Sequence, residues 1–149
     1  MSTAPEKNVT LLRTAYRAVE SGDLDAAEQM LTQDFIANVP GSAAPLIGRD
    51  VWRLGTQAMK DAFPDLKIKI QDIFGVGDKV TVLLRFEGTH QGAFQQIEAT
   101  GRQVGFASIE VYRIEGDKIA EEWVAPDMIS LMRQISPAAD HDPGSHVSP

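Results

Sequence analysis

The sequence contains no cysteine and only three histidines. The lack of cysteine excludes disulfides, thiolate nucleophiles and thiolate metal sites. Two of the histidines, His141 and His146, lie near the C-terminus, which leaves His90 as the one histidine in the body of the chain. No second histidine or paired acidic cluster stands near His90 at the spacing of metal ligands, so we expect no bound metal ion.

Positive charge and long apolar runs are also scarce. The 14 lysines and arginines are scattered and are outnumbered by 21 acidic residues, which gives a net charge of -7. Nucleic acids and anionic membrane surfaces require clustered cations, so we expect neither as a partner. No apolar stretch approaches the ~20 residues that cross a bilayer, and the N-terminus lacks the charged and then apolar layout of a signal peptide. We therefore expect a cytoplasmic protein.

The length of the chain is consistent with one folded domain. A chain of 149 residues is long enough for one domain that buries roughly 70% of its unfolded surface, and it is too short to predict two. We expect this domain to span residues 1–135. Residues 136–149 contain three prolines and almost no large apolar side chain, so we expect this tail to be disordered.

Hydrophobic periodicity predicts helices early in the chain and strands later. Helical spacing with glycine or proline stop signals predicts helices near residues 9–21, 25–31 and 49–63, with a brief strand at 35–39 between the last two. Alternation then predicts strands near 66–70, 80–86, 104–114 and 119–124, and a final short helix follows at 127–134. Helices followed by strands indicate an α+β fold, most simply a curved antiparallel sheet wrapped around three helices.

Asp127 stands where the last predicted strand gives way to the last helix. A carboxylate at such a junction can face a cavity rather than water. The preceding residues, Trp123 to Pro126, are apolar enough that burial would raise the pKa of Asp127 toward that of a useful general base. The alternative role is a helix N-cap, which aspartate favours. Both roles are compatible if one carboxylate oxygen caps the helix and the other faces the cavity.

The strand near residues 104–114 has two different faces. Alternation places Phe106, Ser108, Glu110 and Tyr112 on one face and Ala107, Ile109, Val111 and Arg113 on the other. Glu110 is therefore either a solvated charge on the outer face or an acid that points into a pocket. If Glu110 faces outward, Arg113 becomes the inward polar group.

Five segments of the chain carry a further signal. They read AYRAVESGDLDAAEQMLTQDFIAN, AFPDLKIKIQDIFGVGDKV, FEGTHQGAF, ATGRQVGF and YRIEGDKIAEEWVAPDMISLMRQI. Together they resemble the SnoaL-like polyketide cyclases, a branch of the nuclear transport factor-like superfamily, over nearly all of residues 9–135. SGDLDA is common across the superfamily, whereas GTHQG, TGR and a tryptophan four residues before an aspartate are fairly specific to this branch.

The resemblance implies a cone-shaped α+β barrel whose concave sheet face and long helix enclose an apolar pocket that is open at one end. Members of the family often form dimers through the outer sheet face, so we expect a homodimer. Members with known chemistry close polyketide rings by intramolecular aldol condensation without a metal or organic cofactor, and one aspartate serves as acid and base. The resemblance therefore implies no cofactor, a small hydrophobic or polycyclic substrate, and Asp127 as the catalytic aspartate.

Two further catalytic residues are predicted beside Asp127. His90 would polarise a substrate carbonyl or donate to the developing oxyanion, although a lone loop histidine can equally be solvated or structurally hydrogen-bonded. Glu110 would act as a pocket acid, because ketosteroid isomerase, a remote relative, has an acid at a comparable strand position.

A second group of residues is predicted to contact substrate, with ordinary core packing as the alternative for the aromatic members. These residues are Tyr16, Asn38, Trp52, Tyr112 and Trp123. Many relatives have a histidine where Asn38 stands, so the resemblance supports only amide hydrogen bonding at this position.

Three functions remain open at this point. The first is a cofactor-independent cyclase that acts on polyketide-like substrates by acid–base, aldol-type ring closure. The second is an epoxide-opening or ether-forming cyclase, in which an acid pair such as Asp127 and Glu110 activates a hydroxyl and protonates an epoxide. The third is a protein that shelters a hydrophobic ligand and performs no chemistry.

Overall fold

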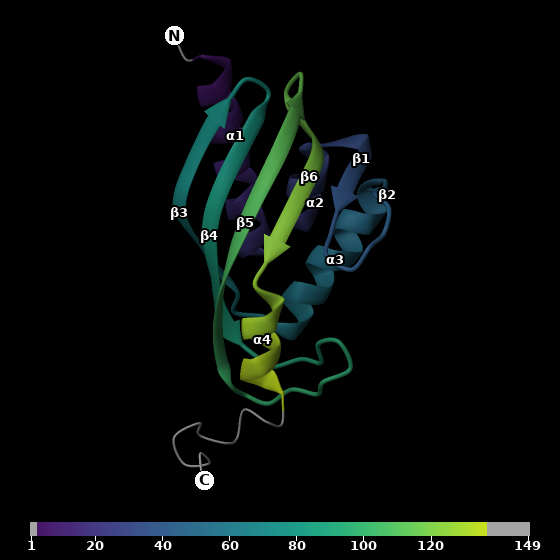
Figure 1. Ribbon diagram of the computed structural model, residues 1–149, viewed down its shortest axis with the longest axis vertical. Coiled ribbons are helices and arrows are strands. Elements are labelled where there is room, and N and C mark those ends of the chain that lie inside the picture. The colour runs from purple at the N-terminus through teal and green to yellow at the C-terminus, as the bar shows by residue number, and fades with distance from the viewer. Residues whose placement is uncertain (1–2, 137–149) are drawn as a thin grey trace.

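The computed structural model describes residues 3–136 as an α+β fold, as predicted (Figure 1). The helices are α1 (Ala4–Ser21), α2 (Leu24–Gln29), α3 (Arg49–Ala62) and α4 (Met128–Ile135). The strands are β1 (Leu31–Asn38), β2 (Leu46–Ile47), β3 (Lys67–Val76), β4 (Lys79–Thr89), β5 (Gln103–Glu115) and β6 (Lys118–Pro126). Within the described residues, no helix is long and apolar enough to span a membrane. Apart from Ser136, the tail that we expected to be disordered lies outside this range.

Local chemistry fixes both ends of α1. The side chain of Thr3 accepts from the Glu6 amide at 3.2 Å, and the Glu6 carboxylate accepts from the Thr3 amide at 3.2 Å, which forms a capping box. Gly22 ends the helix in the left-handed conformation, at a φ of 88°, where glycine has no Cβ to clash. Leu12 and Tyr16, one turn apart, are its buried residues. The helix therefore holds Tyr16 in the core, against the sheet.

The strands form one curved, open sheet in the order β2-β1-β6-β5-β4-β3. Strands β3 to β6 are antiparallel neighbours, whereas β1 pairs with β6 in parallel. We expected an antiparallel sheet, whereas the observed sheet is mixed. Strands β1 and β6 can be parallel because a long crossover joins them and not a hairpin. Helix α1 packs on β3 and β4, and α3 packs on β1, so the early helices cover one face of the sheet.

Helix α3 is attached to the rest of the fold at both ends. At its N-terminus, Arg49 donates from Nη2 and Nε to the Leu31 carbonyl oxygen at 2.6 and 3.1 Å. At its C-terminus, the amides of Gln91 and Gly92 donate to the Ala62 carbonyl oxygen at 3.0 and 3.1 Å. A Cβ on Gly92 would lie 2.2 Å from a carbonyl oxygen of α3, so this contact requires glycine. The segment between β4 and β5 therefore holds the end of α3.

Buried apolar side chains form two clusters on the helix side of the sheet. The first joins α1, β1 and the long strands and contains Phe35 and Leu84, both fully buried. The second joins the end of α3 to β5 and α4 through Phe63, Phe106 and Leu131. Full burial of such a side chain contributes about 1.5–3 kcal/mol to stability. Residues of both clusters surround a cavity between them.

Candidate functional site

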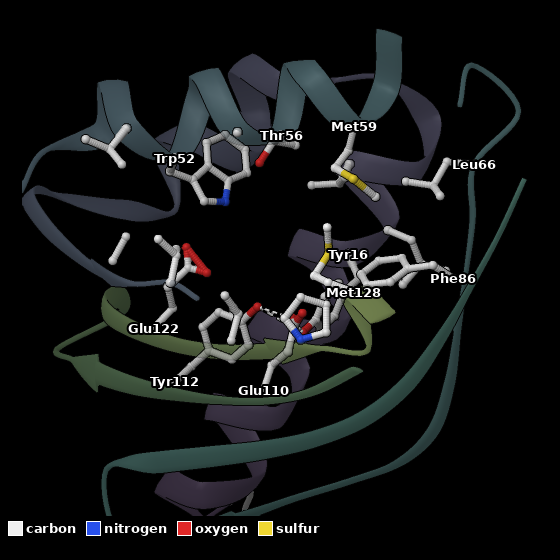
Figure 2. A pocket seen from close by; sticks show the side chains of 18 of the residues that line it. Tyr16, Trp52, Thr56, Met59, Leu66, Phe86, Glu110, Tyr112, Glu122 and Met128 are labelled. Atoms are coloured by element: carbon white, nitrogen blue, oxygen red, sulfur yellow. Dashed lines mark hydrogen bonds between the residues drawn. The ribbon is translucent and has the colours of Figure 1, made fainter. Parts of the chain in front are cut away.

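A cavity of about 230 Å³ lies between α3 and the inner face of the sheet (Figure 2). Most of its lining side chains are apolar. The lining residues that carry polar side-chain atoms are Tyr16, Trp52, Thr56, Glu110, Tyr112 and Glu122. A few polar groups in an apolar wall are typical of small-molecule sites, where they orient the ligand.

Glu110 points from β5 into this cavity, and three hydroxyl groups donate hydrogen bonds to its carboxylate. The hydroxyls of Tyr16 and Tyr112 reach Oε1 at 2.7 and 2.5 Å, and that of Ser108 reaches Oε2 at 2.9 Å. Alternation along β5 places Ser108, Glu110 and Tyr112 on the buried face, and Glu110 is only 6% exposed. Of the two orientations that the sequence left open, the structure therefore has Glu110 facing inward.

The two tyrosines keep their protons and so remain donors. Burial, followed by the negative charge of Glu110, raises the pKa of Tyr16 and of Tyr112 well above the ordinary value of 10.0. The two hydroxyl oxygens also lie 3.0 Å apart, and the rings meet edge to face. A buried network with satisfied donors is rigid, so the position of the Glu110 carboxylate is fixed.

Glu122 is the second acid of the cavity. Across the β5–β6 pair, Tyr112 lies opposite Glu122 and Glu110 lies opposite Val124, so the two glutamates are diagonal neighbours on one face. Such neighbours lie about 7–8 Å apart. Glu122 is 7% exposed, and no side chain within residues 3–136 donates to its carboxyl group. Burial, and then the charge of Glu110, raises the pKa of Glu122 to about 8.

Asn38 supports β6 from outside the cavity lining. Its Nδ2 donates to the Glu122 carbonyl oxygen at 2.9 Å and to Glu121 Oε2 at 3.0 Å. The side chain therefore ties the end of β1 to the backbone of Glu122 and does not line the main cavity, contrary to expectation.

Asp127 also lies outside the cavity, although its neighbours Pro126 and Met128 line the cavity wall. Its Oδ1 accepts from the Ser130 amide at 3.1 Å, and its Oδ2 accepts from the Ser130 hydroxyl at 2.6 Å. The Ser130 hydroxyl, and then the Ser130 amide, lower the pKa of Asp127 below its ordinary value of 3.8. The predicted dry environment and raised pKa are therefore wrong. Both oxygens serve the cap of α4, so neither is left to face a cavity.

His90 is fully buried but does not line the cavity. Its ring packs beside Phe63 of the second apolar cluster, with 5.7 Å between the ring centroids. The Thr100 amide donates to Nδ1 at 3.2 Å, so this pattern assigns the ring proton to Nε2. The position corresponds to the structural alternative for His90 rather than to the expected contact with a substrate carbonyl. Within residues 3–136, no three histidine, aspartate or glutamate side chains are grouped to hold a metal ion.

Trp123 and Arg113 belong to the outer face of the sheet. Trp123 is 36% exposed and lines a groove on that face together with Ile109. Arg113 donates from Nε to Glu121 at 3.2 Å. The expected place of Trp123 in the pocket wall is wrong, because alternation along β6 turns Glu122 inward and Trp123 outward.

The structure brings together part of the predicted site and adds one acid to it. The predicted residues that line the cavity are Tyr16, Trp52, Glu110 and Tyr112. Their contact with a substrate stays a prediction. Glu122 was missed in the sequence, where Glu121 and Glu122 stand side by side and the alternation does not reveal which of them faces inward. Only the structure gives the cross-strand register, in which Glu122 lies opposite Tyr112 and therefore faces inward.

Most of the chain matches a known protein family. The model described as SnoaL-like polyketide cyclase matches residues 10–135. No curated protein matches the chain. IdmH from Streptomyces antibioticus, a candidate polyketide cyclase, is 27% identical over 85% of this chain and 96% of its own, with a TM-score of 0.76.

Two further solved structures share the fold at lower identity. A candidate SnoaL-like polyketide cyclase from Jannaschia sp. CCS1 is 18% identical over 92% of this chain and 96% of its own, with a TM-score of 0.84. AclR, a candidate hydroxylase from Streptomyces galilaeus, is 23% identical over 86% of this chain and 94% of its own, with a TM-score of 0.78. Since the family match runs from within α1 to the end of α4 and includes every strand, the chain belongs to the SnoaL-like polyketide cyclase family.

Proposed function

We propose that the cavity catalyses cofactor-independent ring closure of a polyketide-like carbonyl compound by acid–base chemistry, with Glu122 as the proton carrier. The main support for this proposal is the environment of the Glu122 carboxyl group and its effect on the pKa of that group. This carboxyl group lies in an apolar cavity, and burial and the charge of Glu110 raise its pKa to about 8. A group that titrates near the working pH is suited both to accept and to return a proton. Membership of the polyketide cyclase family supports the reaction class.

The reaction follows three steps. The Glu122 carboxylate takes a proton from a carbon between two carbonyl groups. The carbanion then attacks a second carbonyl carbon of the same molecule, which forms the ring's C–C bond and moves the C=O electron pair to oxygen. Glu122 finally gives its proton to this alkoxide and returns to the carboxylate form. The net change is an intramolecular aldol addition in which all atoms and charges balance.

Glu110 has a different role, as a positioning residue. Its carboxylate already accepts hydrogen bonds from Tyr16, Tyr112 and Ser108, so proton transfer to it would disrupt that network. Its charge acts on Glu122 through the cavity and contributes to the raised pKa of that carboxyl group. The network of hydroxyl donors thus holds in place the charge that tunes the proton carrier.

The first step is testable with 2-tetralone, a two-ring ketone whose α-protons exchange with solvent when a base removes them. In D2O, proton NMR should show deuterium incorporation in the presence of the protein about 10²-fold or more above the buffer rate. Glu122→Gln keeps the shape of the side chain and should return exchange to the buffer rate. Asp127→Asn, which is outside the cavity, is the matched control and should retain exchange.

Two results would contradict the catalytic proposal. One is equal exchange by the wild type and Glu122→Gln. The other is a rise in melting temperature on addition of 2-tetralone with no exchange above buffer, which would show a ligand-binding protein without chemistry.

A second reaction is favoured by the protonation of Glu122 at neutral pH. Because its pKa is about 8, most of this carboxyl group is protonated at pH 7. A protonated Glu122 would give its proton to an epoxide oxygen while a hydroxyl oxygen of the same molecule attacks the epoxide carbon and the C–O bond of the epoxide breaks. The ring oxygen then loses its proton to the Glu122 carboxylate, so the net change is isomerisation of a hydroxy epoxide to a cyclic ether that carries a new hydroxyl group. The two reactions have opposite pH dependence. Aldol closure requires ionised Glu122 and accelerates up to about pH 8, whereas epoxide opening requires protonated Glu122 and slows above it.

We also propose that the protein forms a homodimer through the outer face of the sheet. Leu83 lies opposite Ile109 across β4 and β5, and the two side chains are 38% and 54% exposed. Trp123 on β6 extends this apolar surface. In a two-fold symmetric interface a substitution is present on both subunits, so Ile109→Lys should convert a dimer to a monomer. Light scattering coupled to size-exclusion chromatography measures this change. A monomeric wild type at high micromolar concentration would refute the dimer.

A further inference from the structure

Two hydrogen-bond donors project from α3 into the cavity, on the wall that faces the two glutamates. Figure 2 shows the indole nitrogen of Trp52 and the hydroxyl of Thr56 on this wall, with Glu110 and Glu122 on the sheet side. Trp52 and Thr56 are four residues apart in a helix, so their side chains share one face of α3. Neither group has a hydrogen-bond partner within residues 3–136. The attachments at both ends of α3 keep this face directed at the sheet.

The two tyrosine hydroxyls of the cavity are already engaged. The hydroxyls of Tyr16 and Tyr112 both donate to Glu110, and their raised pKa values keep them protonated in that role. A ligand oxygen that enters the cavity therefore finds free N–H and O–H donors on the α3 wall. A ligand C–H on the opposite side faces Glu122. This arrangement fits a ketone, whose acidic C–H bonds are adjacent to the carbonyl group.

The size of the cavity limits the part of the ligand that it can enclose. An engineered protein cavity of about 150 Å³ binds benzene. The cavity of about 230 Å³ described above is larger by roughly half, which leaves room for one or two fused rings. A flat molecule of four fused rings would have to leave much of its surface outside.

We propose that Trp52 and Thr56 bind the carbonyl oxygen of the substrate and stabilise the oxyanion formed when Glu122 removes the adjacent proton, and that the enclosed part of the substrate is a ketone of one or two rings. The oxyanion step rests on the acid–base function proposed above, whereas binding of the ketone does not require catalysis. Donors that are fixed before the reaction, and are aimed where negative charge develops, need no reorganisation and stabilise the transition state.

Nuclear magnetic resonance gives a direct test, because the sequence contains only two tryptophans. Trp52 lies in the cavity and Trp123 lies on the outer face, so Trp123→Phe assigns the two indole N–H signals. Addition of 2-tetralone to the wild type should move the Trp52 indole proton downfield, because a carbonyl acceptor deshields it. Tetralin has the same rings without the oxygen and should cause no such downfield shift. An equal response to both compounds would overturn the proposed carbonyl contact.

Affinities measured by calorimetry test the second donor and the size limit. Thr56→Val is nearly isosteric and removes the hydroxyl, so it should weaken 2-tetralone binding about 5–10-fold and leave tetralin binding unchanged. Progesterone, a four-ring ketone, should bind at least about tenfold more weakly than 2-tetralone. Unchanged 2-tetralone affinity in Thr56→Val would remove Thr56 from the site, and tighter progesterone binding would overturn the size assignment.

The same ligand separates this proposal from the catalytic one. Glu122→Gln should retain the downfield shift of Trp52, because the donors lie on the other wall. Wild-type protein that shows the shift without α-proton exchange would defeat the catalytic function and leave the ketone site standing. Wild-type protein that exchanges α-protons without the shift would defeat the ketone site and leave the function standing.

Discussion

Glu122 and Asp127 lie close together along β6 and the turn into α4, yet their environments are opposite. Glu122 is 7% exposed and has a pKa raised to about 8 by burial and by Glu110. Asp127 is exposed, and the hydroxyl and amide of Ser130 lower its pKa. The apolar residues that precede Asp127 did not bury it. The burial of these two carboxyl groups therefore depends on the direction in which each side chain projects, and not on the composition of its neighbours in sequence.

The largest expected difference between the two acids is in proton transfer. Glu122→Gln should reduce α-proton exchange of 2-tetralone by about 10²–10⁴-fold, the usual contribution of a positioned base. Asp127→Asn should change it by less than about twofold, because this carboxylate is bound to Ser130 and does not reach the cavity. Initial exchange rates at pH 8 measure both effects. A larger loss in Asp127→Asn than in Glu122→Gln would reverse the comparison.

The next effect concerns the origin of the raised pKa. Wild-type exchange should increase with pH to a plateau with a midpoint near 8, because the ionised form of Glu122 is the base. Glu110→Gln removes the negative charge from the cavity, so the midpoint should move downward, and each pH unit of this shift makes about tenfold more base available at low pH. The measurement is the pH profile of exchange for both proteins. An unchanged midpoint in Glu110→Gln would show that the charge of Glu110 does not raise the pKa of Glu122.

Stability should also depend on Glu122. Its pKa is about 8 in the fold against an ordinary value of 4.5, so the folded state binds this proton more tightly than the unfolded state. The resulting stabilisation is complete below pH 4.5 and is lost as pH rises toward 8, by at most about 1.4 kcal/mol per pH unit.

Glu122→Gln abolishes this dependence. The melting temperature of the variant relative to the wild type should therefore rise between pH 5 and pH 8.5, when both are followed by scanning calorimetry. A difference in melting temperature that is constant across this range would show that Glu122 titrates normally.

The smallest effect is expected for Asp127. The pH dependence of its contribution to stability is opposite to that of Glu122. The lowered pKa means that the carboxylate stabilises the fold above its ordinary pKa of 3.8 and that this contribution is lost as pH falls through the folded value. Asp127→Ala removes the cap of α4 and should lower the melting temperature at pH 7 by roughly 2–4 °C. The deficit should shrink in acid, as measured by thermal unfolding followed by circular dichroism. A deficit that grows in acid would contradict the assigned cap.

The elements of the fold were predictable where their signals are local. The stripe of α1 and its stop at Gly22, and the alternation of β5, each follow from neighbouring residues. The parallel pairing of β1 with β6 was not predicted, because it depends on contacts between segments far apart in the sequence. Strand β2, which pairs with the nearby β1, was not predicted because two residues are too few to show an alternating pattern. Local periodicity contains no information on which strands become neighbours.

The site was predictable only in part, for the same reason. The sequence indicated that Glu110 and Tyr112 share a face, and the structure adds that this face is the inner one. Glu122 became recognisable only through its register with Tyr112. The sequence left both a catalytic and a structural role open for His90, and the position of this ring in the fold, beside Phe63, could not be derived from a loop without periodicity.

The two attachments of α3 have a consequence for how a ligand enters and leaves. A hinge motion of this helix would break the hydrogen bonds of Arg49 to Leu31 at one end and those of Gln91 and Gly92 at the other. Flexible side chains in the lining, such as Met128, can instead rotate without disturbing the backbone. We therefore expect a ligand to enter by such rotamer changes, which take picoseconds to nanoseconds at exposed positions, rather than by a slower hinge motion of α3.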